Sequence, residues 1–222
     1  MRKNNTILGW LPNGTGTDFP FDVLFDRSIN VVTQGIEDVD AIIVWGGEDI
    51  SSSYYGEKPH RYTQNHTGKP SHRDIIEWQA MRYAAEHNIP IIGVCRGAQM
   101  LCAFSGGKLI QDTNNHHSTH NVMTSDGEVM ATSSCHHQMM YPYGVEHEML
   151  AWSEESLSPI YEGENGYVYQ DMHHRVEPEV VYFPQSKGLA IQGHPEWMDF
   201  SSPFIAYLLN LVSTRLLQEE TV

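Results

Sequence analysis

The sequence predicts an α/β fold: a three-layer, mostly parallel doubly wound sheet with helices on both faces and an antiparallel extension. Two continuous apolar runs, 40–45 (DAIIVW) and 91–94 (IIGV), are typical of strands buried on both faces of a sheet. A helix-length segment, 71–87, separates them, and strands that alternate with helices favour a parallel sheet. Several closely spaced strand-like segments later in the chain predict the antiparallel extension.

The chain before residue 71 supplies the first strands and a long loop. We expect a strand over Thr6–Leu11, a turn over 12–16, a short helix near Phe21–Ser28 and a short strand near Asn30–Thr33. The segment Glu48–Pro70 is polar and has no sustained period, which predicts a surface loop. Loops of this length inside compact domains are often functional.

The segment after this loop has the features of a capped helix. Ser71 is placed to cap a helix that ends near His87, with Asp74 at the capping-box position. We expect Glu77 to be a solvent-exposed residue of this helix. The expected packed face consists of Ile75, Trp78, Met81, Arg82 and Ala85.

The second half of the chain predicts short strands and one last helix. A histidine-rich loop is expected over Asp112–His120, and a helix begins near Pro203. The tail 218–222 is expected to be frayed, and residues 1–222 to form one domain. The expected strands are Lys108–Ile110, Glu128–Thr132, Met149–Trp152, Gly166–Tyr169, Val180–Phe183 and Gly188–Gln192.

Composition excludes several classes of function. Thirteen basic residues against 28 acidic ones give a net charge of −15, which disfavours direct binding of nucleic acid. No apolar run is long enough for a membrane span, and the N-terminus lacks a signal-peptide core, so we expect a cytoplasmic protein. Three cysteines without C-x-x-C spacing argue against a disulfide framework and a zinc ribbon.

One cysteine stands where a nucleophile is expected. Cys95 lies between the apolar run 91–94 and a predicted helix over Arg96–Phe104, with glycines at Gly93 and Gly97. Glycines two residues before and after a cysteine are typical of a sharp strand-to-helix turn that presents the side chain. The helix N-terminus behind the sulfur favours the thiolate.

The remaining parts of a catalytic centre are also present. His194 and Glu196 in QGHPEW stand two residues apart in a segment expected to be extended, so the carboxylate can orient an imidazole that acts as the base for Cys95. Backbone N–H groups of Gly47 and Arg96, at the carboxyl ends of neighbouring predicted strands, are candidates for an oxyanion hole.

Five ordered motifs carry a family resemblance over roughly Asp40–Trp197: GGED, GVCRGAQ, GGKLIQD, SSCHHQ and QGHPEW. Together they resemble class I glutamine amidotransferases, whose fold is flavodoxin-like, and within them the branch of gamma-glutamyl-gamma-aminobutyrate hydrolases. The resemblance implies that Cys95 is the nucleophile, His194 the base and Glu196 the orienting acid, and that the reaction passes through a gamma-glutamyl thioester. It also implies an oxyanion hole at Gly47 and Arg96. The substrate-binding residues implied are Gly46, Gln99, His136, His137 and Gln138.

The sequence departs from the hydrolase branch at three places. Gly193 stands where an aromatic residue is usual, and Asn165-Gly166-Tyr167 stands where the branch has a D-G-x-x-E-A element. The region before Asp40 is shorter than in the hydrolases. These differences concern the substrate rather than the triad.

Several residues have a simpler structural interpretation. His116, His117 and His120 have spacing that could converge on a metal, but neighbouring acids and cysteines do not complete a ligand set, so we expect no metal and no cofactor. Cys102 is expected in the core and Cys135 in a structural role.

Three functions fit the sequence. The first is a glutaminase subunit that hydrolyses the side-chain amide of glutamine and supplies ammonia to a separate synthetase or modification enzyme. The second is a stand-alone hydrolase of small gamma-glutamyl amines, and the third is a binding or regulatory module without turnover. The complete triad makes the third the weakest.

Overall fold

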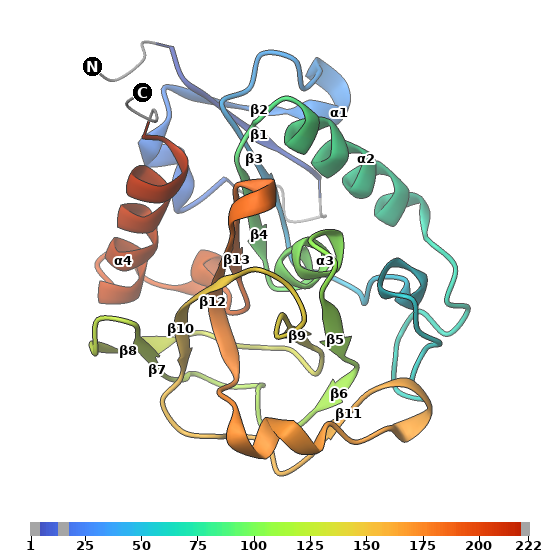
Figure 1. Ribbon diagram of the computed structural model, residues 1–222. Coiled ribbons are helices and arrows are strands. Elements are labelled where there is room, and N and C mark those ends of the chain that lie inside the picture. The colour runs from blue at the N-terminus through green and yellow to red at the C-terminus, as the bar shows by residue number, and fades with distance from the viewer. Residues whose placement is uncertain (1–4, 13–17, 219–222) are drawn as a thin grey trace.

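The computed structural model describes residues 5–12 and 18–218, so most of the expected turn over 12–16 and of the expected tail over 218–222 lies outside the described residues. Its main feature is a nine-stranded mixed sheet in the order β2-β1-β3-β4-β13-β12-β10-β7-β8 (Figure 1). The first five strands are parallel and the rest pair antiparallel. The predicted fold class is therefore confirmed.

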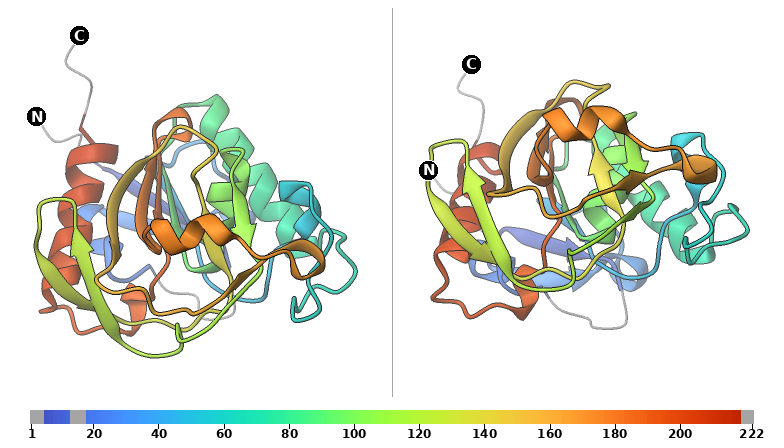
Figure 2. Two further views of the ribbon diagram at one scale, coloured as in Figure 1. Left: turned by 60° about the horizontal axis from the view of Figure 1, so that its bottom comes forward. Right: turned by 90° about the horizontal axis from the view of Figure 1, so that it is seen from below.

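The strands follow the apolar runs of the sequence. The parallel strands are β1 (Ile7–Trp10), β2 (Arg27–Asn30), β3 (Ala41–Val44), β4 (Ile91–Val94) and β13 (Gly188–Ile191). The antiparallel ones are β12 (Pro178–Phe183), β10 (Glu148–Ser153), β7 (His120–Thr124) and β8 (Val129–Thr132). Figure 2 shows the hairpin of β7 and β8 beside the last helix, α4 (Pro203–Leu211).

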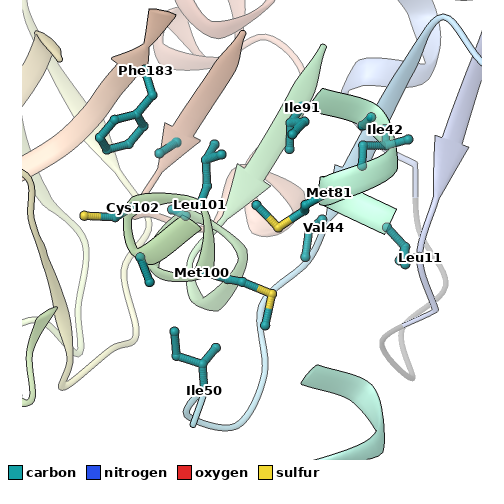
Figure 3. Close-up of a cluster of buried hydrophobic side chains, with 14 of the residues drawn as sticks. Leu11, Ile42, Val44, Ile50, Met81, Ile91, Met100, Leu101, Cys102 and Phe183 are labelled. Carbon is teal, nitrogen blue, oxygen red and sulfur yellow. The ribbon is translucent and has the colours of Figure 1, made fainter. Parts of the chain in front are cut away.

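Helices cover both faces of the parallel half. On one face, α2 (His72–Glu86) and α3 (Arg96–Phe104) cover a cluster that includes Ile42, Val44 and Met81 (Figure 3). On the other face, α4 and the π-helical turn Val212–Leu216 cover Ile43 and the neighbouring apolar side chains. Alternate residues of β3 thus enter opposite cores, which explains why its sequence is continuously apolar.

Two short sheets and several short helical turns complete the fold. Two short sheets pair β5 (Lys108–Ile110) with β9 (Met139–Tyr141), and β6 (Asp112–Thr113) with β11 (Tyr161–Glu162). The short α1 (Val31–Gln34) follows β2. The 3₁₀ turns are Phe21–Leu24, Ser52–Tyr55, Glu164–Gly166, Gln170–His174, Pro184–Ser186 and Pro195–Trp197.

Two expected strands are wrong. The strand expected near Asn30–Thr33 is replaced by β2 over Arg27–Asn30, because the Asn30 side chain accepts a hydrogen bond from Val32 N and starts α1. The helix expected near Phe21–Ser28 is correspondingly reduced to one 3₁₀ turn. The strand expected over Gly166–Tyr169 is also absent, because Asn165 and Gly166 have positive φ and turn the chain.

Helix α2 begins as expected but packs through a partly different face. Ser71 and Asp74 form the predicted capping box. Met81 is buried and Trp78 packs against the core, as expected, but the other buried positions are Asp74, Glu77 and Ala84, and Ile75 is 43% exposed. The expectation that Glu77 is solvated is therefore wrong, because Arg96 lies behind the helix and pairs with its acids.

No helix within residues 5–12 and 18–218 is long and apolar enough to cross a membrane.

Candidate active site

Cys95 lies at a strained turn between the central strand β4 and helix α3. Its φ of 51° and ψ of −108° are rare for a residue with a side chain. The flanking glycines permit the turn, since a Cβ on Gly97 would lie 2.0 Å from Val44 O and one on Gly93 would lie 2.5 Å from Gly97 O. The Cys95 N–H donates to Ile191 O at 2.7 Å, which ties the turn to β13. The thiol thus stands at the N-terminus of α3, where a negative charge is stabilised.

His194 and Glu196 follow strand β13 and lie next to each other. The His194 Nδ1 and Glu196 Oε1 atoms are 2.7 Å apart, and the imidazole stacks on Trp197 with ring centroids 3.8 Å apart. The segment was expected to be extended, but Pro195 begins a 3₁₀ turn. The turn brings the carboxylate beside the ring although the backbone is not extended.

The protonation of His194 depends on its neighbours. Burial lowers the pKa of His194, but hydrogen bonds and Coulomb attraction to Cys95 and Glu196 outweigh burial and raise it to about 10. An opposite charge on each side of an imidazole favours its protonated form. At neutral pH His194 is therefore protonated.

The turn after β3, which contains Gly46 and Gly47, lies next to both Cys95 and His194. A Cβ on Gly46 would lie 3.0 Å from His194 Cε1 and 3.4 Å from Cys95 Cβ, so this backbone passes directly by both side chains. Gly47 has a φ of +145°, and a Cβ there would lie 2.2 Å from Arg73 Nη1. Gly47 favours glycine because of its positive φ, and a side chain at Gly46 would press against Cys95 and His194, so backbone groups rather than side chains stand at the edge of the site.

A buried ionic network, missed by the sequence analysis, holds this turn. The Arg73 guanidinium donates to Trp45 O at 3.0 Å, to Gly46 O at 2.9 Å and to Glu77 Oε1 at 2.7 Å. Arg96 pairs through its two terminal nitrogens with Asp74 and Glu77. The acids of α2 therefore connect the Gly46–Gly47 turn with the residue after Cys95. The signal in the sequence was the i, i+3 spacing of Asp74 and Glu77, which places both on one helix face.

A cleft of about 820 Å³ opens beside Gly47 and Arg96. Its walls come from the loop between β3 and α2, which includes Asp49 and Lys69, and from Arg73 of α2 and Arg96 of α3. The long polar loop expected over Glu48–Pro70 thus forms one side of a cavity large enough for a small molecule. Acidic and basic groups line it together, as a zwitterionic ligand would require.

The five expected substrate-binding residues have different environments. Gly46 lies against Cys95 and His194, as described above. Gln99 and Gln138 are buried, and Gln99 Nε2 donates to Gln138 O at 2.9 Å. His136 is also buried, with Nδ1 2.8 Å from the same carbonyl.

His137 is connected to the cleft through a carboxylate. Its Nε2 lies 3.1 Å from Asp49, which lines the cleft, and its Nδ1 lies 3.4 Å from Asp112. The hydrogen bond to Asp49 is the main reason that the pKa of His137 is raised. Asp49 is a further candidate residue that the sequence did not indicate.

The other two cysteines differ in environment. Cys102 is fully buried, as expected for a core residue, and burial raises the pKa of its thiol to about 12. Cys135 is exposed. Neither lies at a strand-to-helix turn with flanking glycines, so Cys95 alone of the three has that setting.

A cysteine at a strained turn on a doubly wound sheet, beside a histidine and a carboxylate, is the arrangement of class I glutamine amidotransferase-like proteins. Comparison with known families agrees: the peptidase C26 model matches residues 16–180, and the chain belongs to this family.

Curated relatives carry names from the same class. The glutamine amidotransferase-like protein YvdE of Lactococcus lactis is 30% identical over 179 residues, which cover 71% of this chain and 66% of YvdE. Gamma-glutamyl-CDP-amidate hydrolase of Campylobacter jejuni is 32% identical over 95 residues, which cover 43% of this chain and 42% of that protein. The chain thus matches just under two thirds of the first relative and less than half of the second.

Solved structures share the fold at low sequence identity. A glutamine amidotransferase from Thermotoga maritima has a TM-score of 0.55 and 12% identity, with 96% of this chain and 87% of that chain covered. The glutaminase domain of Trypanosoma brucei CTPS with bound acivicin has a TM-score of 0.55 and 15% identity, with 97% and 96% covered. At this identity the likeness concerns the fold.

Proposed function

We propose that this protein hydrolyses gamma-glutamyl amides, with glutamine as the simplest substrate, through a triad of Cys95, His194 and Glu196. The observation that carries the proposal is the convergence of Cys95, His194 and Gly46 at the carboxyl ends of β4, β13 and β3. The family membership supports the reaction class. We also propose that residues 1–222 act as one catalytic domain.

The first half of the reaction forms a thioester. The Cys95 sulfur, its proton held by His194, attacks the amide carbon, and the carbonyl oxygen becomes an oxyanion beside the N–H groups of Gly47 and Arg96. His194 then donates its proton to the amine as the C–N bond breaks. Glu196 holds the imidazole in orientation and stabilises its charged form.

The second half regenerates the thiol. Water attacks the thioester carbon while His194 takes one of its protons, and the C–S bond breaks as the glutamyl carboxylate forms. The proton returns to the sulfur. Each step uses side chains and backbone groups of this chain.

The fate of the amine separates two candidates. In the first, glutamine is the substrate and ammonia passes to a separate acceptor enzyme. In the second, the chain alone hydrolyses a larger gamma-glutamyl amine. The name of the Campylobacter jejuni relative supports the second candidate, and the open cleft beside Gly47 and Arg96 leaves room next to the proposed oxyanion hole for an amine larger than ammonia.

Glutamate release tests both candidates. We expect the full chain to release glutamate from glutamine and from gamma-glutamyl-aminobutyrate, and Cys95→Ala to reduce both rates by about 10⁴-fold or more. Cys102→Ala is the matched control and should retain the rates, because Cys102 lies in the core. A rate on the larger amide at or above that on glutamine, without any partner, would decide for the stand-alone hydrolase. Full activity in folded Cys95→Ala would overturn the triad.

A further inference from the structure

A second group of chemically active side chains lies outside the proposed triad. His116 precedes β7, His136 lies between β8 and β9, and Glu179 belongs to β12; these strands belong to or adjoin the antiparallel half of the molecule (Figure 1). One ligand-type atom of each lies within 4.8 Å of the others. Their exposed fractions are only 0%, 5% and 1%, so solvent does not satisfy them.

Four atoms of this group lack hydrogen-bond partners among the described residues. They are both ring nitrogens of His116, His136 Nε2 and Glu179 Oε2, and all four are buried. A buried polar atom without a partner costs about 1–3 kcal/mol, and four in one place would be unusual without a ligand.

In His136 and Glu179 the protein holds the opposite atom of the side chain. His136 Nδ1 lies 2.8 Å from Gln138 O, so Nδ1 carries the proton and Nε2 presents its lone pair. Glu179 Oε1 lies 2.8 Å from His120 Nε2 and accepts from Ser153 Oγ at 3.2 Å, which leaves Oε2 without a partner.

His116 faces two carboxylates and has no hydrogen bond to either. Its Nε2 faces Glu177 Oε2 at 3.4 Å, and its Nδ1 faces Glu179 Oε1 at 3.9 Å. Glu177 is itself fixed, because it accepts from Leu157 N and Ser158 N, both at 2.9 Å, and from the Tyr161 hydroxyl at 2.8 Å. Outer partners that fix one atom of a ligand and leave the other free are the usual surroundings of a metal site.

We propose that His116 Nδ1, His136 Nε2 and Glu179 Oε2 bind a divalent transition metal ion, with Zn²⁺ as the ion that fits best. Two imidazoles and one carboxylate are a known zinc ligand set, and each donor is a type that Zn²⁺ accepts. With bonds of about 2.0–2.1 Å, ligand atoms of a tetrahedral site lie about 3.4 Å apart. Small side-chain rotations would draw the three atoms together.

From the sequence we expect no metal, because the acids and cysteines near His116 do not complete a ligand set. In the structure, candidate ligands come instead from distant segments, since His136 and Glu179 belong to other parts of the chain. His117 is exposed, and His120 orients Glu179. Of the three histidines in that loop, His116 is thus the one that contributes a ligand in this proposal.

The site would connect to the proposed triad through one segment. His136 N donates to His116 O at 2.9 Å, and Ser133 O accepts from His194 N at 2.8 Å. A metal at His116 and His136 would therefore fix residues 133–138, which hold the backbone of His194. The metal takes a positioning role, and no step of the proposed hydrolysis passes through it.

The direct test is the metal content of the full chain, prepared without a histidine tag or chelator from zinc-supplemented medium. We expect about one zinc per chain by elemental analysis. After metal removal, titration with Co²⁺ should give the visible absorption of a four-coordinate site. Folded wild-type protein with only trace zinc and no such absorption would overturn the proposal, whatever the triad does.

Variants locate the ion. We expect Glu179→Gln to lose the zinc, and Glu177→Gln to weaken zinc affinity by about 10- to 100-fold through its effect on His116. His60→Gln is the matched control, because His60, Asp112 and Glu162 form the other such group among the described residues and Asp112 and Glu162 are partly exposed. Loss of zinc in His60→Gln with retention in Glu179→Gln would contradict the assignment. Because His136 is also a predicted substrate-binding residue, a change in activity would not distinguish metal binding from substrate binding. The variants are therefore compared by their metal content.

Discussion

Two largely buried polar clusters differ in how their charges are paired. In the first, Arg73, Asp74, Glu77 and Arg96 pair opposite charges, and both arginines have carboxylate partners. In the second, His116, His136 and Glu179 converge but leave four buried atoms without hydrogen-bond partners. A paired cluster holds backbone in place, whereas an unpaired one is suited to bind a ligand.

The largest effect is expected from breaking the paired cluster. Glu77→Ala leaves Arg73 and Arg96 without their shared carboxylate, and removal of one partner of a buried pair costs about 3–5 kcal/mol. Urea unfolding would measure the loss. Glu86→Ala on the same helix is the control, because its ion pair with Arg82 is exposed and should contribute less than about 1 kcal/mol. Equal losses in the two variants would show that the cluster has no special role.

The next effect concerns the turn that this cluster holds. Gly47→Ala places a Cβ against Arg73 and disturbs a proposed oxyanion donor, so we expect turnover to fall by about 10²–10³-fold. Gly56→Ala is the matched control: Gly56 also has positive φ, at +74°, but a Cβ there meets nothing within 4 Å. It should lose some stability and keep its turnover. If Gly47→Ala keeps full turnover, Gly47 is not at the oxyanion.

Zinc bound at the cluster of His116, His136 and Glu179 should stabilise the folded protein. Zinc at 100 times its dissociation constant would stabilise the folded protein by about 2.7 kcal/mol. Thermal melting with and without zinc would show the gain as a raised Tm. Glu179→Gln should melt at the same temperature in both conditions, whereas Glu77→Gln, although less stable, should keep the zinc-dependent rise. If Glu179→Gln kept the zinc-dependent rise in Tm and Glu77→Gln lost it, the cluster of Arg73, Asp74, Glu77 and Arg96 would be the one that binds zinc.

The smallest expected effect is a dependence on pH. Because the pKa of His194 is raised from 6.5 to about 10, its attraction to Glu196 is fully present below pH 6.5 and is lost as the pH rises through about 10. The difference in unfolding free energy between wild type and Glu196→Gln should therefore be larger near pH 6.5 than near pH 10. A difference that grows with pH would mean that His194 is neutral beside Glu196.

The sequence predicts what depends on neighbouring residues in the chain. The strand at β4, the turn at Cys95 and the pairing of His194 with Glu196 follow from apolar runs, flanking glycines and short spacing. The burial of Glu77 and Glu179 could not be predicted, because each depends on a partner that is distant in the sequence and that the fold brings close: Arg96 for the first and His120 for the second. The strand expected after Asn30 failed for a local reason, since the side chain of Asn30 caps a helix turn that periodicity does not reveal.

The central claim is that Cys95 carries the glutamyl group during turnover. Mass spectrometry of protein quenched in acid during reaction with glutamine or gamma-glutamyl-aminobutyrate would detect this group directly. We predict one gamma-glutamyl adduct, located on the peptide that contains Cys95, present in Cys102→Ala and absent in Cys95→Ala. Steady turnover in Cys95→Ala, or an adduct located on Cys102 or Cys135 instead, would contradict the account.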